Sequence, residues 1–442
     1  MKIYREPLAK MLSLVNQYTA ATTDLVIEQQ VRQIIETVIA KGDAALRDYS
    51  EKFDGVKLTD LKVSEEALVE AYNSLEPVLK EALEVAKNNI EAFHKRQIDQ
   101  SFIDLDTPGI MRGQKVTPLK RVGIYVPGGT AAYPSTILMC ALPAKLAGVK
   151  EVIMVTPPQK DGIALIVLGA AKLAGVDAVY QVGGAQAVGA LAYGTESIPK
   201  VDKIVGPGNI YVATAKRQVF GQVSIDMIAG PSEIGILADE TANPIHLAAD
   251  LLSQAEHDKR ARAILITDSE VLAHAVADEV ERQLQTLPRQ DIARTAIEER
   301  SFIAIMDSVA DMFTLMNEVA PEHLEIQLAN AMNYMSLVEN AGSVFLGSYT
   351  AEPLGDYMGG PNHVLPTSGT ARFSSPLGVY DFVKRTAFMH FSKERLAELA
   401  PHIATLARTE GLEGHARSIE VRFDQTKDFS VTDEAEVVGY GH

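Results

Sequence analysis

The stretch AKLAGVKEVIMV, residues 144–155, indicates the fold, because residues 171–182 repeat it almost unchanged as AKLAGVDAVYQV. Each copy reads as a helix end, a glycine stop and a β-strand. The copies start 27 residues apart, a length that fits one unit of strand and helix. Consecutive units of this kind predict a parallel sheet with helices on its faces.

Glycine-rich turns surround this repeat. The strand RVGIYV, residues 121–126, runs into PGGT and a helix from about residue 135, and the turns VGGAQAVG and VGPGNIYV begin at residues 182 and 205. We expect all three turns at the carboxyl ends of strands, where an open sheet binds ligands and a helix start holds phosphate. The chain has no strict GxGxxG motif here, so tight turns without a ligand remain an equal alternative.

The strands SIDMIAG and IGILAD follow from residue 224, and beyond the next helix the strand ARAILIT, residues 261–267, starts a second run of alternating strands and helices that ends with GSVFLGS, residues 342–348. We therefore predict an α/β protein with two Rossmann-like parallel-sheet domains and small helical appendages at both ends. The expected divisions are an N-terminal helical extension (1–24), a discontinuous first α/β domain (25–125 and 235–380), an inserted second α/β domain on the cofactor side (126–234) and a C-terminal appendage that begins with a helix (381–442).

Composition limits the function classes. The 442 residues include 41 basic and 58 acidic side chains, a net charge of −17, which argues against nucleic acid or an anionic membrane as the main partner. The N-terminus lacks the apolar core of a signal peptide, and the longest apolar run, residues 162–171, is too short to cross a bilayer. The single cysteine, Cys140, sits in an apolar helical run; we expect a buried structural thiol and a cytoplasmic protein.

The segment NPIHLAADLLSQAEHD, residues 243–258, carries the first candidate site. Asn243 and Pro244 are typical of a helix start. Gln254 and His257 lie three residues apart at the end of one helical face, so they could converge on one ion or ligand. A pair of solvated polar side chains is the alternative for this spacing alone.

Three further polar clusters stand out. APEHLEI contains the adjacent residues Glu322 and His323, an acid–base pair suited to neutral pH. The long glycine- and proline-rich segment 347–373 contains Asp356 and His363, and TEGLEGHARS contains Glu410 and His415. Two imidazoles, one carboxylate and one amide oxygen make a plausible zinc set, although spacing alone does not bring its members together: Gln254, His257, Asp356 and His415.

These segments resemble the histidinol dehydrogenase family almost from end to end. The resemblance is carried by eight strings in the family's order: YVPGGTAAYPST, VGGAQAV, GPGNIYV, DMIAGPSE, LLSQAEHD, APEHLE, GDYMGGPNHVLPTSGTARF and EGLEGHARS. It implies Glu322 and His323 as the catalytic acid–base pair. It also implies three further sets: the zinc ligands Gln254, His257, Asp356 and His415; the substrate contacts Ser232, His363 and Glu410 together with His323 and the zinc ligands; and the NAD contacts Tyr125, Gln186 and Asn209.

The resemblance further implies a reaction and an assembly. L-Histidinol would be oxidised to L-histidine through L-histidinaldehyde, with two NAD used per turnover and one Zn²⁺ per subunit to position the substrate. His323 would act as the general base and Glu322 would activate water. A homodimer is implied, in which the C-terminal appendage crosses to the partner, so that Glu410 and His415 of either subunit complete a shared site.

Two other readings remain open from the residues themselves. A zinc-dependent hydrolase of an amide or ester would also use a Glu–His pair beside a metal. A non-catalytic α/β binding module would have the same turns without turnover. NADH formation from histidinol would distinguish a dehydrogenase from the zinc hydrolase. Loss of turnover in His323→Ala would distinguish an enzyme from the binding module.

Overall fold

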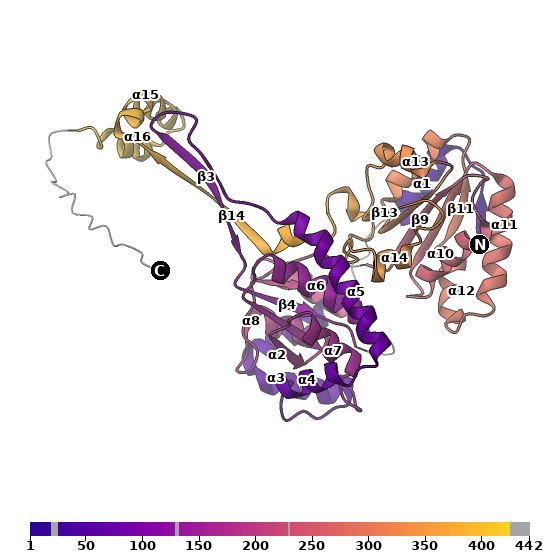
Figure 1. Cartoon of the computed structure of the whole chain (residues 1–442). Coiled ribbons are helices and arrows are strands. Elements are labelled where there is room, and N and C mark those ends of the chain that lie inside the picture. The colour runs from indigo at the N-terminus through magenta and orange to yellow at the C-terminus, as the bar shows by residue number, and fades with distance from the viewer. Residues whose placement is uncertain (19–24, 129–131, 229, 425–442) are drawn as a thin grey trace. The chain divides into compact units, whose positions relative to one another are not determined.

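The computed structural model describes residues 1–18, 25–128, 132–228 and 230–424. The chain forms two compact units (Figure 1). The first unit comprises Met1–Ile98 and Pro118–Lys384, and the second comprises Asp99–Thr117 and Arg385–His442. Residues 129–131 of the first glycine turn and 425–442 of the predicted appendage lie outside the described residues. No helix in the described ranges has the length and apolar character needed to span a bilayer.

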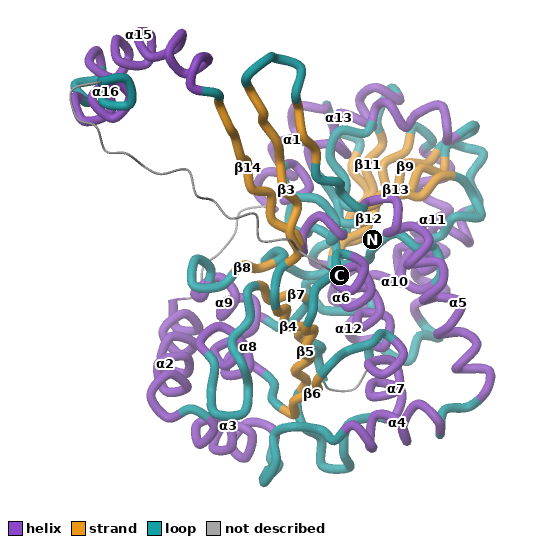
Figure 2. Tube along the Cα trace, turned by 60° about the vertical axis from the view of Figure 1, so that its left-hand side comes forward, coloured by secondary structure: helices purple, strands orange, loops and turns teal. Residues whose placement is uncertain are grey.

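The repeated stretch builds a five-stranded parallel sheet, as predicted, in the order β6-β5-β4-β7-β8 (Figure 2). Its strands are nearly continuous apolar runs, which suits burial on both faces. The chain adds β5 and β6 on one side of β4 and then β7 and β8 on its other side, so the strand order reverses between β4 and β7. Open α/β sheets bind ligands at such a point. The strands are β4 (Arg121–Tyr125), β5 (Glu151–Thr156), β6 (Ala178–Gln181), β7 (Lys203–Val205) and β8 (Ser224–Ile225).

Helices α6 to α9 connect these strands, and the N-terminal helices pack against them. Contacts join α2 to α8 and α9, α4 to α7 and α5 to α6. Cys140 lies fully buried in α6, and burial raises the pKa of its thiol, as expected of a structural cysteine. The helices are α2 (Leu25–Lys41), α3 (Asp43–Tyr49), α4 (Glu65–Asn73), α5 (Pro77–His94), α6 (Pro134–Leu146), α7 (Leu165–Leu173), α8 (Gly184–Tyr193) and α9 (Ile210–Val219), with a π-helix η1 (Ser50–Asp54) and a 3₁₀-helix η2 (Lys95–Gln97).

This packing differs from the expected grouping of residues 25–125 with residues 235–380. The buried faces of α2 to α5 enter the cores around the five-stranded sheet, and β4 itself belongs to that sheet. The apolar stripe of an amphipathic helix shows which face is buried but not which sheet receives it.

The second run of strands forms a six-stranded parallel sheet in the order β1-β11-β10-β9-β12-β13. The N-terminal strand β1 pairs with β11, so part of the predicted helical extension is a strand. Segment 323–327, which the sequence analysis did not assign to a strand, is the interior strand β12. The strands are β1 (Lys2–Tyr4), β9 (Glu233–Ala238), β10 (Arg262–Thr267), β11 (Phe302–Ile305), β12 (His323–Gln327) and β13 (Ser343–Leu346).

Helices flank this sheet as well. The predicted start of α10 is confirmed, since the Asn243 side chain accepts the backbone N–H of Ile245. The elements are α1 (Leu8–Tyr18), α10 (Pro244–Ala255), α11 (Glu270–Leu284), α12 (Gln290–Glu299), α13 (Val309–Val319) and α14 (Glu352–Tyr357), with 3₁₀-helices η3 (Ala331–Leu337), η4 (Thr370–Arg372) and η5 (Val379–Phe382).

The second unit is small. Its three-stranded sheet has the order β14-β3-β2, and two helices follow in the chain. The expected helix from residue 381 is wrong, because residues 383–391 form strand β14 and only then does α15 begin. The elements are β2 (Phe102–Asp104), β3 (Ile110–Pro118), β14 (Val383–Phe391), α15 (Lys393–Thr409) and α16 (Glu413–Glu420).

Candidate active site

Two cavities in the first unit meet at the turns that follow β4 and β7. The larger, about 960 Å³, lies at the carboxyl ends of the five-stranded sheet. The smaller, about 510 Å³, is lined by six of the residues that the sequence predicts for zinc, substrate or catalysis. Pro127 and Asn209 line both cavities, so a ligand in one would border a ligand in the other. The six predicted residues are Ser232, Gln254, His257, His323, Asp356 and His363.

His323 begins β12, next to the start of β9 in the sheet. Its ring Nδ1 lies 2.9 Å from the backbone carbonyl oxygen of Glu233, so in the neutral ring Nδ1 carries the proton and donates it. Burial lowers the pKa of His323 to about 4, which keeps the ring neutral at pH 7. Its Nε2 is buried and has no hydrogen-bond partner among the described residues. This lone pair is therefore free to accept a proton in the smaller cavity.

Glu322, the residue before it, is also buried. Its Oε2 accepts the backbone N–H of Glu233 at 3.0 Å. Burial and the nearby Glu233 carboxylate raise the pKa of Glu322 well above its usual value. A carboxyl with a raised pKa is a stronger base once ionised. Glu322 and His323 thus supply two proton acceptors at the amino end of one strand, β12.

Asp356 is placed by α14 and His363. The His363 Nδ1 lies 3.1 Å from the Asp356 backbone oxygen and 3.5 Å from its Oδ1, and its Nε2 lies 3.2 Å from Oγ1 of Thr136 on α6. Burial alone would raise the pKa of Asp356, but hydrogen bonding and charge from His363 outweigh it and lower the pKa to about 2. The carboxylate is ionised at neutral pH, as a metal ligand must be.

A possible metal-binding group includes Asp356. Donor atoms of His323, Glu352 and Asp356 all lie within 4.8 Å of one another, while Gln254 and His257 line the same cavity. Among the described residues, His323 Nε2 and Glu352 Oε1 are buried without hydrogen-bond partners and lie 3.5 Å apart. Unpartnered buried donors and acceptors are costly unless a ligand satisfies them, so these nitrogen and oxygen atoms suit Zn²⁺ and a polar substrate.

Glu352 was not predicted from the sequence. It is 1% exposed, and burial together with the charge of Asp356 raises its pKa to about 8. Its backbone N–H donates to Oε1 of Glu325 on β12 at 2.9 Å, and Ser253 Oγ on α10 lies 3.4 Å from its Oε2. Glu352 therefore links the three elements that carry the candidate site. Its position four residues before Asp356 on one helical face was the available signal.

Glu410 and His415 belong to the second unit. Glu410 is the C-cap of α15 and His415 lies on α16, both with exposed side chains. The structure thus gathers three of the four predicted zinc ligands in one cavity of the first unit, and the fourth lies on the second unit.

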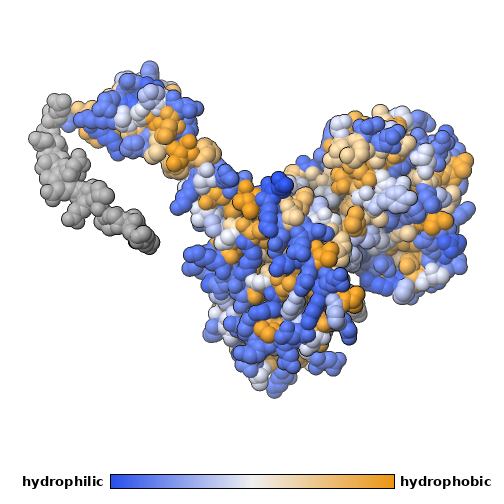
Figure 3. All heavy atoms as spheres, viewed as in Figure 1, coloured by the Kyte–Doolittle hydropathy of each residue, from blue (hydrophilic) through white to orange (hydrophobic). Residues whose placement is uncertain are grey.

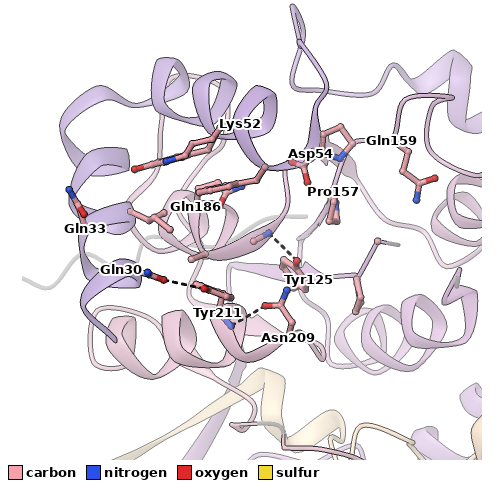
Figure 4. Close-up of a pocket in the computed structure, with 18 of the residues that line it drawn as sticks. Gln30, Gln33, Lys52, Asp54, Tyr125, Pro157, Gln159, Gln186, Asn209 and Tyr211 are labelled. Atoms are coloured by element: carbon pink, nitrogen blue, oxygen red, sulfur yellow. Dashed lines mark hydrogen bonds between the residues drawn. The ribbon is translucent and has the colours of Figure 1, made fainter. Parts of the chain in front are cut away.

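The larger cavity contains the three predicted NAD contacts (Figure 4). The hydroxyl of Tyr125 accepts the backbone N–H of Gly184 at 3.0 Å, Gln186 is buried on α8, and Asn209 caps α9. Gly206 in the turn after β7 has φ 109°, and a Cβ there would lie 2.2 Å from the Tyr125 carbonyl oxygen, so only glycine fits.

A buried ion pair, which the sequence did not reveal, anchors this turn. Lys216 on α9 pairs with Asp226, and both side chains are at most 2% exposed. Lys216 Nζ donates to the Gly206 carbonyl oxygen at 2.9 Å, while Asp226 Oδ2 accepts the Gly206 N–H at 2.7 Å. Both backbone groups of Gly206 are therefore held by charged side chains.

The chain matches known proteins over nearly all of its length. The histidinol dehydrogenase family model matches residues 18–423. Histidinol dehydrogenase of Lactiplantibacillus plantarum is 66% identical over 424 residues, which cover 96% of this chain and 99% of the relative. That of Listeria monocytogenes is 57% identical over 425 residues, covering 96% and 100%. The crystal structure of histidinol dehydrogenase from Elizabethkingia anophelis has a TM-score of 0.91 and 39% identity, covering 96% of this chain and 98% of that chain.

Proposed function

This chain belongs to the histidinol dehydrogenase family, and from that premise we propose how its residues divide the work. The activity is the NAD-dependent oxidation of histidinol in histidine biosynthesis. We propose the full four-electron oxidation of L-histidinol through L-histidinaldehyde to L-histidine, with two NAD per turnover and one zinc ion per subunit. The free, buried Nε2 of neutral His323 in the smaller cavity is the observation that carries this proposal.

Zinc would be held by Gln254, His257 and Asp356 of the smaller cavity together with His415. When bound, the ion would hold the imidazole and amino groups of histidinol and so fix the carbinol carbon. His323 is within reach of the same group of donor atoms, but we assign it to the substrate hydroxyl, because a metal-bound Nε2 could not accept a proton. Glu352 we assign to positioning, since it touches His323, α10 and β12 at once.

The first oxidation needs one proton acceptor. His323 Nε2 would take the hydroxyl proton while NAD in the larger cavity accepts the hydride from the carbinol carbon. His323 can do this without first losing a proton, because its low pKa leaves Nε2 unprotonated. The bond from Nδ1 to the Glu233 carbonyl fixes the ring during the transfer.

The second oxidation needs water. Glu322 would take a proton from a water molecule as the water oxygen attacks the aldehyde carbon, and His323 would return the proton from the first oxidation to the aldehyde oxygen, which gives the hydrate. His323 would then accept a hydroxyl proton of the hydrate while a second NAD accepts the hydride. The carboxylic acid product requires no covalent thiol intermediate, in agreement with the burial of Cys140.

A homodimer is supported by the makeup of the second unit. Its buried hydrophobic cluster consists of three alanines, Ala404, Ala407 and Ala416, whereas several large apolar side chains are exposed. Figure 3 shows hydrophobic residues at the surface of this unit. A partner subunit would cover them, and the unit would carry Glu410 and His415 to a shared site. The exposed residues are Phe102 (56%), Ile103 (60%), Leu105 (67%), Met389 (71%) and Leu406 (66%).

The assembly can be tested by mixing inactive variants. Unfolding and refolding His323→Ala together with His415→Ala should restore activity if His415 serves the partner, because one site of each mixed dimer is then intact. No recovery, although mixed dimers form, would place His415 in the site of its own subunit. We also propose that the protein works in the cytoplasm, which its single cysteine fits.

The reaction itself is tested with purified dimer, zinc, L-histidinol and NAD. We expect two NADH for each histidinol consumed. Flat NADH absorbance together with cleavage of an amide or ester substrate would support a zinc hydrolase instead.

A further inference from the structure

Glu233, the first residue of β9, contacts both members of the proposed acid–base pair through its backbone. Its carbonyl oxygen accepts the hydrogen bond from Nδ1 of His323 at 2.9 Å, and its backbone N–H donates to Oε2 of Glu322 at 3.0 Å. One residue therefore orients the imidazole ring of His323 and the carboxyl group of Glu322. A small movement of Glu233 would reach both proton acceptors at once.

The side chain of Glu233 is held by the neighbouring strand. Its Oε1 accepts from Nε of Arg262 at 2.9 Å and also pairs with Nη2 of the same guanidinium. The two residues begin their strands, β9 and β10, and lie opposite each other in the parallel register. Glu233 is 3% exposed and Arg262 is 8% exposed, so solvent screens the ion pair little. The pair thus ties the start of β9 to the start of β10.

Arg262 holds the start of β9 at a second point. Its backbone N–H donates to the carbonyl oxygen of Ser232 at 3.0 Å, and Ser232 lines the smaller cavity. Neither Glu233 nor Arg262 lines either of the two cavities. Their side chains therefore act on the site through the residues that they hold, without touching a ligand in it.

The ionic character of this contact is costly in a buried place. Burial raises the pKa of Glu233, while the charge and the hydrogen bonds of Arg262 oppose that rise and favour the ionised carboxylate. For stability alone, apolar side chains of similar volume would serve as well as a buried ion pair. An ion pair with two guanidinium contacts differs from them in fixing one geometry. That geometry is set at the peptide that orients His323 and Glu322.

We propose that Glu233 and Arg262 are positioning residues for the oxidation of histidinol: their ion pair fixes the first peptide of β9, and this peptide orients His323 and Glu322. The proposal rests on the acid–base roles proposed above for those two residues. Because a carbonyl oxygen accepts only from a protonated nitrogen, the fixed carbonyl of Glu233 keeps the proton of neutral His323 on Nδ1. The Nε2 atom is then the one that accepts the substrate proton.

The test compares three single variants with the wild-type holoenzyme. Arg262→Met removes the charge but keeps much of the side-chain length, and Arg262→Lys keeps the charge without the two-nitrogen contact. Glu233→Gln keeps the shape of the side chain without its charge. The matched control is Lys203→Met, because it breaks another buried ion pair, Lys203–Asp381, and Lys203 lines neither cavity.

Steady-state rates would give kcat and the KM values for histidinol and NAD, mass spectrometry would give the zinc content, and thermal unfolding would give Tm. We expect Arg262→Met to lower kcat by roughly tenfold to a hundredfold, as a small misplacement of catalytic groups does. The KM for NAD and the zinc content should stay the same. Arg262→Lys should recover part of the lost kcat, and Glu233→Gln should lose less, since its amide oxygen still accepts from Arg262. Lys203→Met should lower Tm and keep the wild-type kcat.

A double variant separates positioning from stability. Arg262→Met combined with Glu233→Gln leaves no uncompensated buried charge at this place, so Tm should recover toward the wild-type value. The kcat should stay low, because no ion pair then fixes the first peptide of β9. If Arg262→Met alone does not fold, the double variant provides the same comparison.

Three results would overturn the proposal. They are a wild-type kcat in Arg262→Met or in the double variant, a loss of kcat in Lys203→Met as large as that in Arg262→Met, and a loss confined to the KM for NAD. Wild-type protein that forms no NADH from histidinol would instead refute the proposed reaction. Wild-type protein that forms two NADH per histidinol, beside variants with unchanged kcat, would refute the positioning role alone.

Discussion

The buried Lys216–Asp226 pair offers a quantitative test of how the turn after β7 is held. Lys216→Met keeps most of the side-chain volume but leaves the Asp226 carboxylate buried without its counter-charge. Breaking such a pair costs about 3–5 kcal/mol. Two backbone donors remain on Asp226, the N–H groups of Gly206 at 2.7 Å and Met227 at 2.6 Å, so we expect the lower end, about 3 kcal/mol.

Thermal unfolding followed by circular dichroism measures this loss. For a cooperative unit of 150–250 residues, about 3 kcal/mol corresponds to a Tm decrease of roughly 6–12 °C. The matched control is Arg217→Met, one residue further along α9, because the Arg217–Glu28 pair is 41% and 28% exposed and such pairs contribute about 0–1 kcal/mol. Adding Asp226→Asn to Lys216→Met should recover part of the lost stability. Equal melting temperatures for Lys216→Met and Arg217→Met would refute the reasoning.

The remaining predictions concern the site. His257→Ala should lose zinc by mass spectrometry, whereas His323→Ala should keep it and lose about 10²- to 10⁴-fold in kcat; zinc loss in both variants would contradict separate roles. Glu322→Gln should lower the NADH yield from two toward one per histidinol, with aldehyde detected by a carbonyl reagent, and an unchanged yield would exclude Glu322 from the hydration step.

Local sequence pattern predicted the parallel α/β architecture because its signals are local. The repeated helix, glycine and strand at residues 144–155 and 171–182 lead to β5 and β6 as expected. Among the strands that escaped prediction, two show a clear physical reason. HLEIQ (323–327) is a short interior strand whose Glu and Gln break the apolar run, and VKRTAFMHF (383–391) is largely exposed, so no buried face marks its period.

Long-range placement was beyond the sequence pattern. The stripes of α2 to α5 did not reveal that they pack around the five-stranded sheet. In the site, isolated acidic residues were missed because their partners lie on other elements: Glu352 lies near His323 of β12, and Asp226 pairs with Lys216 of α9 only after folding. The motifs shared with the family predicted six residues that line the smaller cavity. The individual roles of these residues remain predictions.

The central claim is that the smaller cavity holds a zinc ion and the substrate beside the unpartnered Nε2 of His323. A crystal structure of the dimer with zinc, L-histidinol and NAD tests it most directly. We predict zinc at about 2.0–2.2 Å from donor atoms of Gln254, His257, Asp356 and one His415, with His323 Nε2 facing the substrate hydroxyl. An ion bound instead by His323 and Glu352 would contradict the account.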